Sequence, residues 1–196
     1  MENKKLIHLF AVPLFIKPFK YPEKERFVQH AKSYPTNELS NVGGFQSINL
    51  EQTDEIVSEF IVSAVDCFQE AMSVFGIEEN SSILVDNIWL NVNSKDHWNR
   101  IHNHPDADFA VVVYFKVPKN SGNICFYSND PVNQYKSFYT IPLLNDNEFT
   151  RLSYCTTPQE DSMLIFPGHL MHDVYPNESD EERISVAFNV RIKRRK

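Results

Sequence analysis

The stretch Phe109–Ser128, FAVVVYFKVPKNSGNICFYS, carries the pattern that decides the fold. Its first part, 109–117, is rich in β-branched and aromatic residues, which favour a buried strand. The run Pro118–Gly122 has the composition of a turn, and a second short strand is predicted over 123–128. The stretch therefore predicts two strands joined by a turn, which is the repeating unit of an all-β fold.

Strand-like segments of similar length lie on both sides of this stretch. Upstream, residues 83–92 alternate between apolar side chains on one face and Trp89 and Asn91 on the other. The strands predicted downstream are 137–143, 151–157, 162–166, 173–175 and 183–192. Short strands separated by turns at intervals of about 8–12 residues are typical of a sandwich or jelly roll. We therefore predict a mainly β protein with a cupin-like jelly roll, the double-stranded β-helix.

The part of the chain before residue 80 is predicted to supply elements that support these strands. Residues 6–19 are predicted to be extended, and one helix is predicted from about Glu51 to Phe75. Its apolar residues recur every three or four positions, at Ile56, Phe60, Ala64, Phe68, Met72 and Phe75. Gly76 stands where a helix-ending glycine belongs. We expect a single domain over 1–196, in which 1–80 supply an N-terminal strand and helix and 81–193 form the jelly-roll core.

The charge and glycine content exclude two classes of function. The formal net charge is −7, and the last six residues hold five of the 19 positive charges, so the rest of the chain is more acidic still. An acidic surface argues against a nucleic-acid partner, because phosphate contacts need clustered Lys and Arg. There are only five glycines, and no glycine-rich phosphate loop is present.

Hydropathy and cysteine usage suggest an intracellular protein. No apolar run approaches the length of about 20 residues that a membrane span needs, which predicts no membrane association. Three cysteines, Cys67, Cys125 and Cys155, are an odd number without a C-x-x-C motif, so we expect buried free thiols in a reducing, cytoplasmic compartment. A homodimer stays an open alternative to a monomer.

Two pairs of histidines stand out among the seven in the chain: His102 with His104, and His169 with His172. In an extended segment, residues two apart point to the same side, so His102 and His104 can converge on one point. His172 offers a third ligand about 70 residues later. Two adjacent ligands and one distant ligand match a three-ligand site of the kind found in non-haem iron(II) oxygenases. Asp106 is the alternative member of this set, and His169 is expected beside the site or on the surface.

Eleven residues after His172, the segment Arg183-Ile184-Ser185 opens an apolar strand. A guanidinium binds a carboxylate through two parallel hydrogen bonds. Ser185 faces the same way as Arg183 and adds a hydroxyl donor. This spacing predicts a carboxylate-binding site near the histidines, whereas the alternative for Arg183 is a surface ion pair with Glu181 or Glu182.

These residues resemble the double-stranded β-helix oxygenases that use iron(II) and 2-oxoglutarate, and more narrowly a small bacterial and phage family of such oxygenases. The resemblance covers most of 89–190. It rests on Trp89-Leu90-Asn91, His102-Asn103-His104-Pro105, Tyr114, Phe166-Pro167 before His172, Val174-Tyr175-Pro176-Asn177, and the Glu-Arg-Ile-Ser-x-Ala-Phe-Asn element over 182–189. One departure is Ala110-Val111-Val112-Val113-Tyr114, where the family has Ser-Gly-Val-Tyr-Tyr, so the substrate pocket is expected to differ in shape.

The resemblance implies an iron(II)- and 2-oxoglutarate-dependent dioxygenase. It implies iron held by His102, His104 and His172, with these three and Arg183 as the catalytic set. The distal carboxylate of the small-molecule cosubstrate 2-oxoglutarate would be gripped by Arg183 and Ser185, with help from Tyr114 or Asn91. Oxidative decarboxylation to succinate, with O₂, would drive hydroxylation of an unidentified substrate. Because ligating imidazoles must be neutral, activity is expected to fall as the pH drops through about 6.5.

Two alternatives come from different functional classes. The first is a cupin-like metal enzyme that does not use 2-oxoglutarate, such as a three-histidine dioxygenase. The second is a non-catalytic binding module on the same jelly roll, with incidental histidines.

Overall fold

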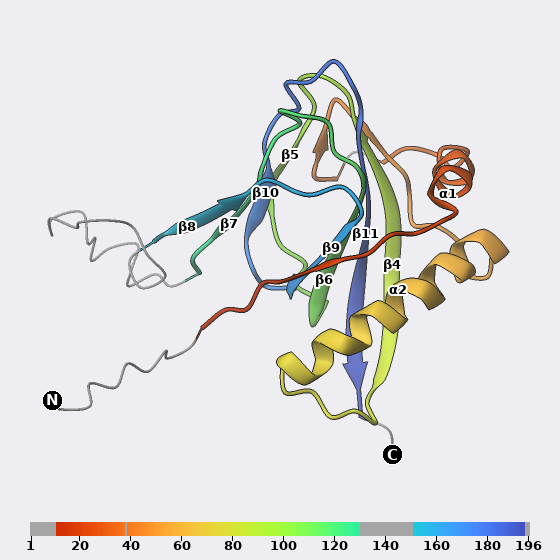
Figure 1. The fold of residues 1–196 in the computed structure, drawn as a ribbon, viewed down its shortest axis with the longest axis vertical. Coiled ribbons are helices and arrows are strands. Elements are labelled where there is room, and N and C mark those ends of the chain that lie inside the picture. The colour runs from red at the N-terminus through yellow and green to blue at the C-terminus, as the bar shows by residue number, and fades with distance from the viewer. Residues whose placement is uncertain (1–10, 38, 130–150, 195–196) are drawn as a thin grey trace, which may run out of the picture.

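The computed structural model describes residues 11–37, 39–129 and 151–194. Two antiparallel sheets and two helices make up this part of the chain (Figure 1). The helices are α1 (Lys24–Ala31) and α2 (Glu55–Val74). The strands are β1 (Phe15–Pro18), β2 (Asn41–Val42), β3 (Phe45–Gln46), β4 (Ser82–Asn93), β5 (Trp98–His102), β6 (Phe109–Lys116), β7 (Ile124–Tyr127), β8 (Ser153–Thr156), β9 (Ser162–Pro167), β10 (His172–Val174) and β11 (Arg183–Lys193).

The larger sheet has the strand order β1-β9-β6-β11-β4-β3, and the smaller one β2-β5-β10-β7-β8. Every pairing is antiparallel, and neighbours in each sheet are mostly distant in sequence, as in a jelly roll. Figure 1 shows the smaller sheet facing one side of the larger sheet, while both helices lie on the other side. The predicted fold class, mainly β with an N-terminal helical portion and a jelly roll, is confirmed.

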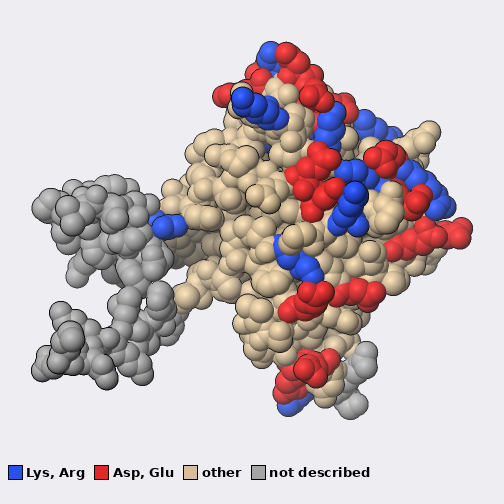
Figure 2. Space-filling model, in the orientation of Figure 1, with Lys and Arg blue, Asp and Glu red and all other residues tan. Residues whose placement is uncertain are grey.

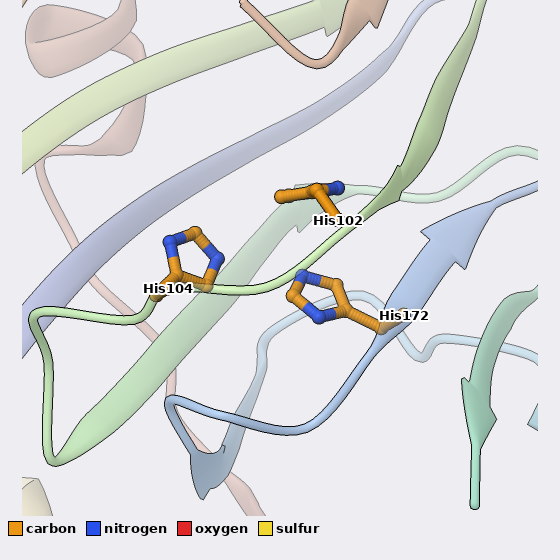
Figure 3. A group of neighbouring side chains, drawn as sticks. All are labelled: His102, His104 and His172. Atoms are coloured by element: carbon orange, nitrogen blue, oxygen red, sulfur yellow. The ribbon is translucent and has the colours of Figure 1, made fainter. Parts of the chain in front are cut away.

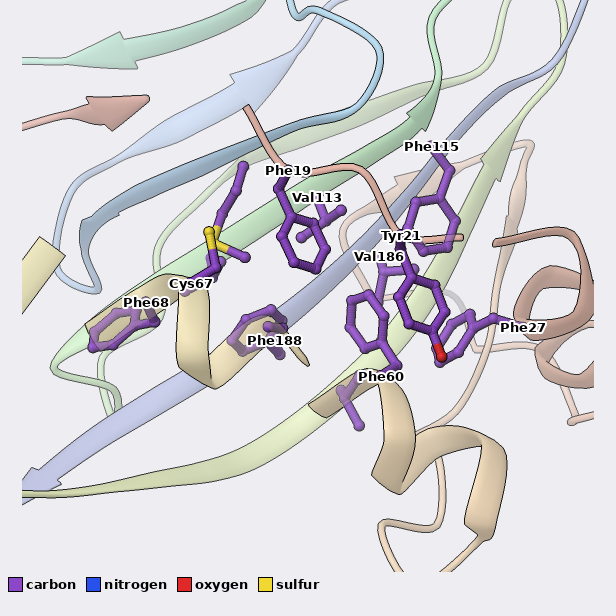
Figure 4. Packing of buried hydrophobic residues seen from close by; sticks show 14 of the residues in the cluster. Phe19, Tyr21, Phe27, Phe60, Cys67, Phe68, Val113, Phe115, Val186 and Phe188 are labelled. Carbon is purple, nitrogen blue, oxygen red and sulfur yellow. The ribbon is translucent and has the colours of Figure 1, made fainter. Parts of the chain in front are cut away.

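The main core lies between α2 and the outer face of the larger sheet (Figure 4). Phe60 of α2 is fully buried and makes edge-to-face or tilted contacts with Tyr21, Phe27, Phe115 and Phe188. Such aromatic pairs add to the free energy gained from burying apolar area. A second, smaller cluster fills the space between the sheets; it contains Ala110, Tyr114, Ile124, Phe126, Leu164, Phe166 and Leu170.

The helix prediction was right in its apolar stripe and too long at its start. The helix begins at Glu55, where the carboxylate of Asp54 accepts hydrogen bonds from the backbone N–H groups of Ile56 and Val57. This cap satisfies donors that a helix end leaves free, so the helix starts after Asp54 rather than near Glu51. Gly76, just after the helix, has φ +71°, the left-handed conformation expected of a helix-ending glycine.

Other differences from the sequence predictions concern short elements. The helix α1 and the strands β2, β3 and β5 were not predicted, because 8-, 2-, 2- and 5-residue segments carry too little periodicity to be recognised. Only 15–18 of the extended segment 6–19 form a strand, and residues 6–10 lie outside the described residues. The predicted strand 137–143 also lies outside them.

The prediction of three free thiols was wrong for two cysteines. Cys125 of β7 and Cys155 of β8 are direct register partners, and a disulfide joins them. Strand pairing brings together residues that are 30 positions apart, and nothing in their local sequence indicates that pairing. Cys67, in α2, is a buried free cysteine as expected.

Charged side chains are unevenly distributed over the face shown in Figure 2. They crowd the half of the molecule that carries the helices and the two ends of the long axis, whereas the surface over β7 and β10 carries few. No helix in the described part of the chain is long and apolar enough to cross a membrane.

Candidate functional site

Three histidines meet between the two sheets (Figure 3). His102 ends β5, His172 begins β10, and the two are register partners across that strand pair. His104 follows β5 by two residues, and its backbone N–H donates to the carbonyl of Gly168 at 2.7 Å. One nitrogen from each ring lies within 4.8 Å of the others. The sequence prediction that these three residues converge is therefore correct in its geometry.

Two of the rings are held by backbone carbonyls. Nδ1 of His102 lies 2.6 Å from the carbonyl of Arg100, and Nδ1 of His172 lies 2.9 Å from that of Leu170. Because a carbonyl oxygen only accepts, each Nδ1 carries the hydrogen. The lone pair of each ring is then on Nε2, which is the form that a metal-ligating histidine takes when its other nitrogen is anchored.

Burial keeps these rings uncharged. It lowers the pKa of His104 to about 4 and that of His172 to about 3, and the neighbouring His102 adds a smaller effect in the same direction. Burial also lowers the pKa of His102. Three neutral imidazoles with converging nitrogens are a donor set that suits iron, zinc, copper or nickel.

Neither Asp106 nor His169 belongs to this group. Asp106 is an exposed turn residue, and the group of residues able to share a metal contains only the three histidines among the described His, Cys, Asp and Glu. Asp173, which follows His172, acts on the group through its charge, which raises the pKa of His102 and so opposes the effect of burial. Its carboxylate accepts a hydrogen bond from the hydroxyl of Tyr127 at 2.9 Å. The sequence placed Asp173 in a strand but did not predict this hydrogen bond, because Tyr127 lies 46 residues away.

Polar residues form a row across the inner face of the larger sheet. Gln46 of β3 pairs with Asn91 of β4, Asn91 pairs with Ser185 of β11, and Ser185 pairs with Tyr114 of β6. All four side chains are buried. Asn91, Ser185 and Tyr114 are three of the four residues that the sequence suggested for 2-oxoglutarate, so antiparallel pairing brings residues from three strands into one line.

Arg183, the fourth of these residues, is only 1% exposed. It lies two residues before Ser185 on the same strand, and therefore on the same face. Its Nη1 donates to the carbonyls of Ser121 and, at 3.1 Å, of Tyr175. Its Nη2 is buried without a partner among the described residues. Arg183 does not form the surface ion pair with Glu181 or Glu182 that was the alternative: Glu181 pairs with Lys116 and Glu182 with Lys32.

Gly122 makes room for this guanidinium. Its φ is +89°, and a Cβ atom there would lie 2.2 Å from the carbonyl oxygen of Tyr175 and 2.8 Å from Nη1 of Arg183. Only glycine combines that backbone conformation with so close an approach. Burial also raises the pKa of Tyr114 to about 12, so its hydroxyl stays protonated beside the positive charge of Arg183.

A cavity of about 540 Å³ opens beside the histidines. Trp89 and the rings of His102 and His104 form part of its wall, and the Trp89 and His104 rings lie 5.8 Å apart. Its carboxamide side chains are Asn37, Gln46, Asn49, Asn87, Asn103 and Asn189. Arg100 is the one charged side chain among the described residues that line it, and no carboxylate is among them.

Comparison with known proteins gives one family match. The model of the family described as "Putative 2OG-Fe(II) oxygenase" matches residues 87–189, which span the strands from β4 to β11. No curated protein matches the chain significantly by sequence.

Solved structures share the fold at low sequence identity. An oxidoreductase of the 2OG-Fe(II) oxygenase family from Burkholderia pseudomallei aligns over 93% of this chain and 85% of its own, with 14% identity and a TM-score of 0.63. HygX from Streptomyces hygroscopicus, with nickel, 2-oxoglutarate and hygromycin B bound, aligns over 91% and 82%, with 11% identity and a TM-score of 0.62. The viral collagen prolyl hydroxylase of Paramecium Bursaria Chlorella virus-1, in complex with 2-oxoglutarate, aligns over 90% and 94%, with 11% identity and a TM-score of 0.57.

Proposed function

The chain belongs to the 2OG-Fe(II) oxygenase family, and from that premise we propose that it hydroxylates a C–H bond of its substrate with iron(II), 2-oxoglutarate and O₂. One observation carries the proposal: Nη2 of the buried Arg183 has no hydrogen-bond partner among the residues that the structure describes, on the sheet face that looks toward the three histidines. A buried guanidinium with a free donor is stabilised by a carboxylate, and 2-oxoglutarate brings one.

We assign iron(II) to His102, His104 and His172. The support is their mutual distance, their neutral state, and the backbone carbonyls that leave Nε2 of His102 and His172 free to bind. Three ligands leave coordination positions open for a cosubstrate, as the family's chemistry requires. The alternative set that contains Asp106 is the weaker proposal, because that carboxylate is exposed in a turn.

We assign the distal carboxylate of 2-oxoglutarate to Arg183, with Ser185, Tyr114 and Asn91 beside it. Ser185 and Tyr114 add hydroxyl donors, and the high pKa of Tyr114 keeps its proton in place. Two carbonyls hold Nη1 of Arg183, so that Nη2 is left to the ligand. HygX and the viral hydroxylase contain 2-oxoglutarate in their structures, which supports a cosubstrate site in this fold.

When bound, iron(II), 2-oxoglutarate and O₂ supply the oxidising power, with 2-oxoglutarate converted to succinate and CO₂. The protein orients and shields these groups. His102 and His172 would hold the metal from the smaller sheet and His104 from the loop after β5, while Arg183 on the larger sheet would fix the far end of the cosubstrate. The apolar cluster around Phe126 and Phe166 excludes water from one side of His172, whose ring lies 4.8 Å from that of Phe166.

The test is iron binding and succinate formation by wild type, Arg183→Met and Arg183→Lys. We expect wild type to bind iron and release succinate, and Arg183→Met to bind iron but to lose most of its affinity for 2-oxoglutarate. Arg183→Lys should keep part of that affinity, because lysine keeps the positive charge but lacks the two parallel N–H donors of the guanidinium. Arg26→Met is the control, because Arg26 lies on the surface and pairs with Glu59 at 3.2 Å.

Succinate release that persists unchanged in His172→Ala would refute the proposed mechanism. The three-imidazole donor set also fits a cupin-like dioxygenase without 2-oxoglutarate. That candidate is favoured if Arg183→Met keeps its metal-dependent turnover and wild type does not bind 2-oxoglutarate. A protein that takes up no iron would favour the non-catalytic binding module.

A further inference from the structure

We propose that the cavity beside Trp89 binds a neutral saccharide unit, a pyranose ring of a glycoside, as the substrate. This inference rests on the proposed function for its chemistry, but the binding site is argued from the cavity alone. Family membership does not specify a substrate, and neither the metal group nor the Arg183 region uses the carboxamides that line this cavity.

The first argument is the charge of the lining. Carboxamide side chains both donate and accept hydrogen bonds without carrying charge, and they make up six of the fourteen lining residues. No described lining residue is a carboxylate, so these residues offer a cationic ligand no counter-charge. Arg100 is exposed and is the one cationic side chain among the described lining residues, which is too little positive charge for a nucleotide's phosphates. The cavity therefore favours a neutral, hydrogen-bonding ligand.

The second argument is two amide oxygens that have no partner. Oε1 of Gln46 and Oδ1 of Asn189 are buried, line the cavity and accept no hydrogen bond from the described residues. An unpaired buried acceptor costs free energy that a ligand donor recovers. Two such acceptors call for a ligand with at least two N–H or O–H donors.

The third argument is the position of these acceptors relative to Trp89. Gln46 is paired with Asn91, two residues beyond Trp89 on β4, and Asn189 lies beside Asn87, two residues before it. Asn91 and Asn87 are four residues apart on the strand, roughly 13 Å. A ligand that meets both acceptors carries donors on opposite edges and a flat face that covers the indole.

A pyranose ring meets all of these conditions. Its axial C–H face packs on an indole, and its hydroxyls donate and accept around the whole perimeter. A prolyl ring would also pack there, but it has no donor. A nucleobase has donors at its edge but few sp³ C–H bonds to hydroxylate, whereas every ring carbon of a sugar has one. The rings of His104 and Trp89 lie 5.8 Å apart, so a pyranose ring on the indole would lie beside the metal group.

Tryptophan fluorescence tests binding without relying on turnover. The chain has two tryptophans, and Trp98 does not line the cavity, so Trp98→Phe leaves Trp89 as the only reporter. The protein is loaded with Zn²⁺ and 2-oxoglutarate, and titrated with methyl β-glucopyranoside, methyl β-galactopyranoside, methyl α-mannopyranoside, thymidine and a proline-rich peptide. Saturation-transfer NMR on wild type gives the same answer if Trp98→Phe does not fold.

We expect at least one glycoside to change the Trp89 signal. Gln46→Leu and Asn189→Leu should each weaken its affinity about tenfold, the worth of one hydrogen bond to a buried acceptor. Gln69→Leu is the matched control on the exposed side of α2 and should leave the affinity unchanged.

If 2-oxoglutarate binds but no glycoside does, or if thymidine or the peptide binds in their place, the saccharide inference is wrong and the proposed function stands. Equal affinity of the glycoside for Gln46→Leu, Asn189→Leu and wild type also overturns the inference. If the glycoside binds as expected and 2-oxoglutarate does not, the saccharide site stands and the proposed function fails.

Discussion

His102 and His172 are direct partners across the β5–β10 strand pair, and their ring centroids lie 4.3 Å apart. Strand pairing sets this distance, so the two side chains arrive together whenever the smaller sheet forms. His104 completes the group from the loop that follows, tied by its backbone to Gly168.

Removing one of these rings should abolish tight metal binding. We expect His172→Ala to weaken the affinity for Fe²⁺ or Zn²⁺ by about 100-fold or more, the upper end of what even indirect support of a ligand is worth. His169→Ala is the matched control, because His169 is not in the metal group although it lies three residues away. Titration calorimetry measures both; equal affinities would show that the histidines do not bind the metal together.

Replacing Gly122 should damage the cosubstrate site and leave the metal site intact. In Gly122→Ala, the new methyl group would collide with the Tyr175 carbonyl and with Nη1 of Arg183. We expect weaker 2-oxoglutarate binding and a loss of stability larger than the roughly 1–2 kcal/mol that a left-handed alanine costs. Gly76→Ala has a similar φ, +71°, and nothing within 4 Å, so it should show only that smaller cost. Unchanged 2-oxoglutarate affinity in Gly122→Ala would mean that Arg183 does not hold the cosubstrate.

The metal-free protein should lose stability as the pH falls below about 6.5. Unfolded histidines bind protons near that pH, whereas burial lowers the pKa of His104 to about 4 and of His172 to about 3 in the folded protein. The unfolded state therefore binds more protons across this window, and acid favours it by about 1.4 kcal/mol per histidine per pH unit. Urea unfolding between pH 7 and pH 4, with His104→Phe for comparison, checks the sign; a flat profile would contradict it.

Phe60 should be among the most costly core positions to truncate. It is fully buried and touches aromatic rings from α1, β6, β11 and the segment before α1. We expect Phe60→Ala to reduce the free energy of unfolding by about 3–5 kcal/mol. Val62→Ala, at a position that is 60% exposed, should change it by less than about 0.5 kcal/mol. Chemical denaturation of the two variants makes the comparison.

The sequence predicted what depends on periodicity and on short-range spacing. Alternation along 83–92 correctly separated Ile88, Leu90 and Val92, which are buried in the main core, from Trp89 and Asn91 on the inner face. The three histidines were found because two of them are two residues apart in an extended segment and the third follows a recognisable strand.

What the sequence did not predict depends on partners that are distant in the chain. The pairing of Gln46 with Asn91 joins β3, a strand of two residues, to the long strand β4 across 45 positions of sequence. The disulfide between Cys125 and Cys155 likewise needs the β7–β8 register. A single sequence carries no signal for such pairings, so the wall of the cavity became visible only in three dimensions.

Alternation along β4 and β11 has a consequence for how this protein changes over generations. Leu90, Val186 and Phe188 pack in the main core under α2, whereas Trp89, Asn91 and Ser185 lie on the opposite face of the sheet, toward the candidate site. The two sets share a backbone, and their side chains point to opposite faces of the sheet. Substitutions can therefore change the residues that face the site while the core residues stay the same, so the same strands can acquire a new substrate specificity without a new fold.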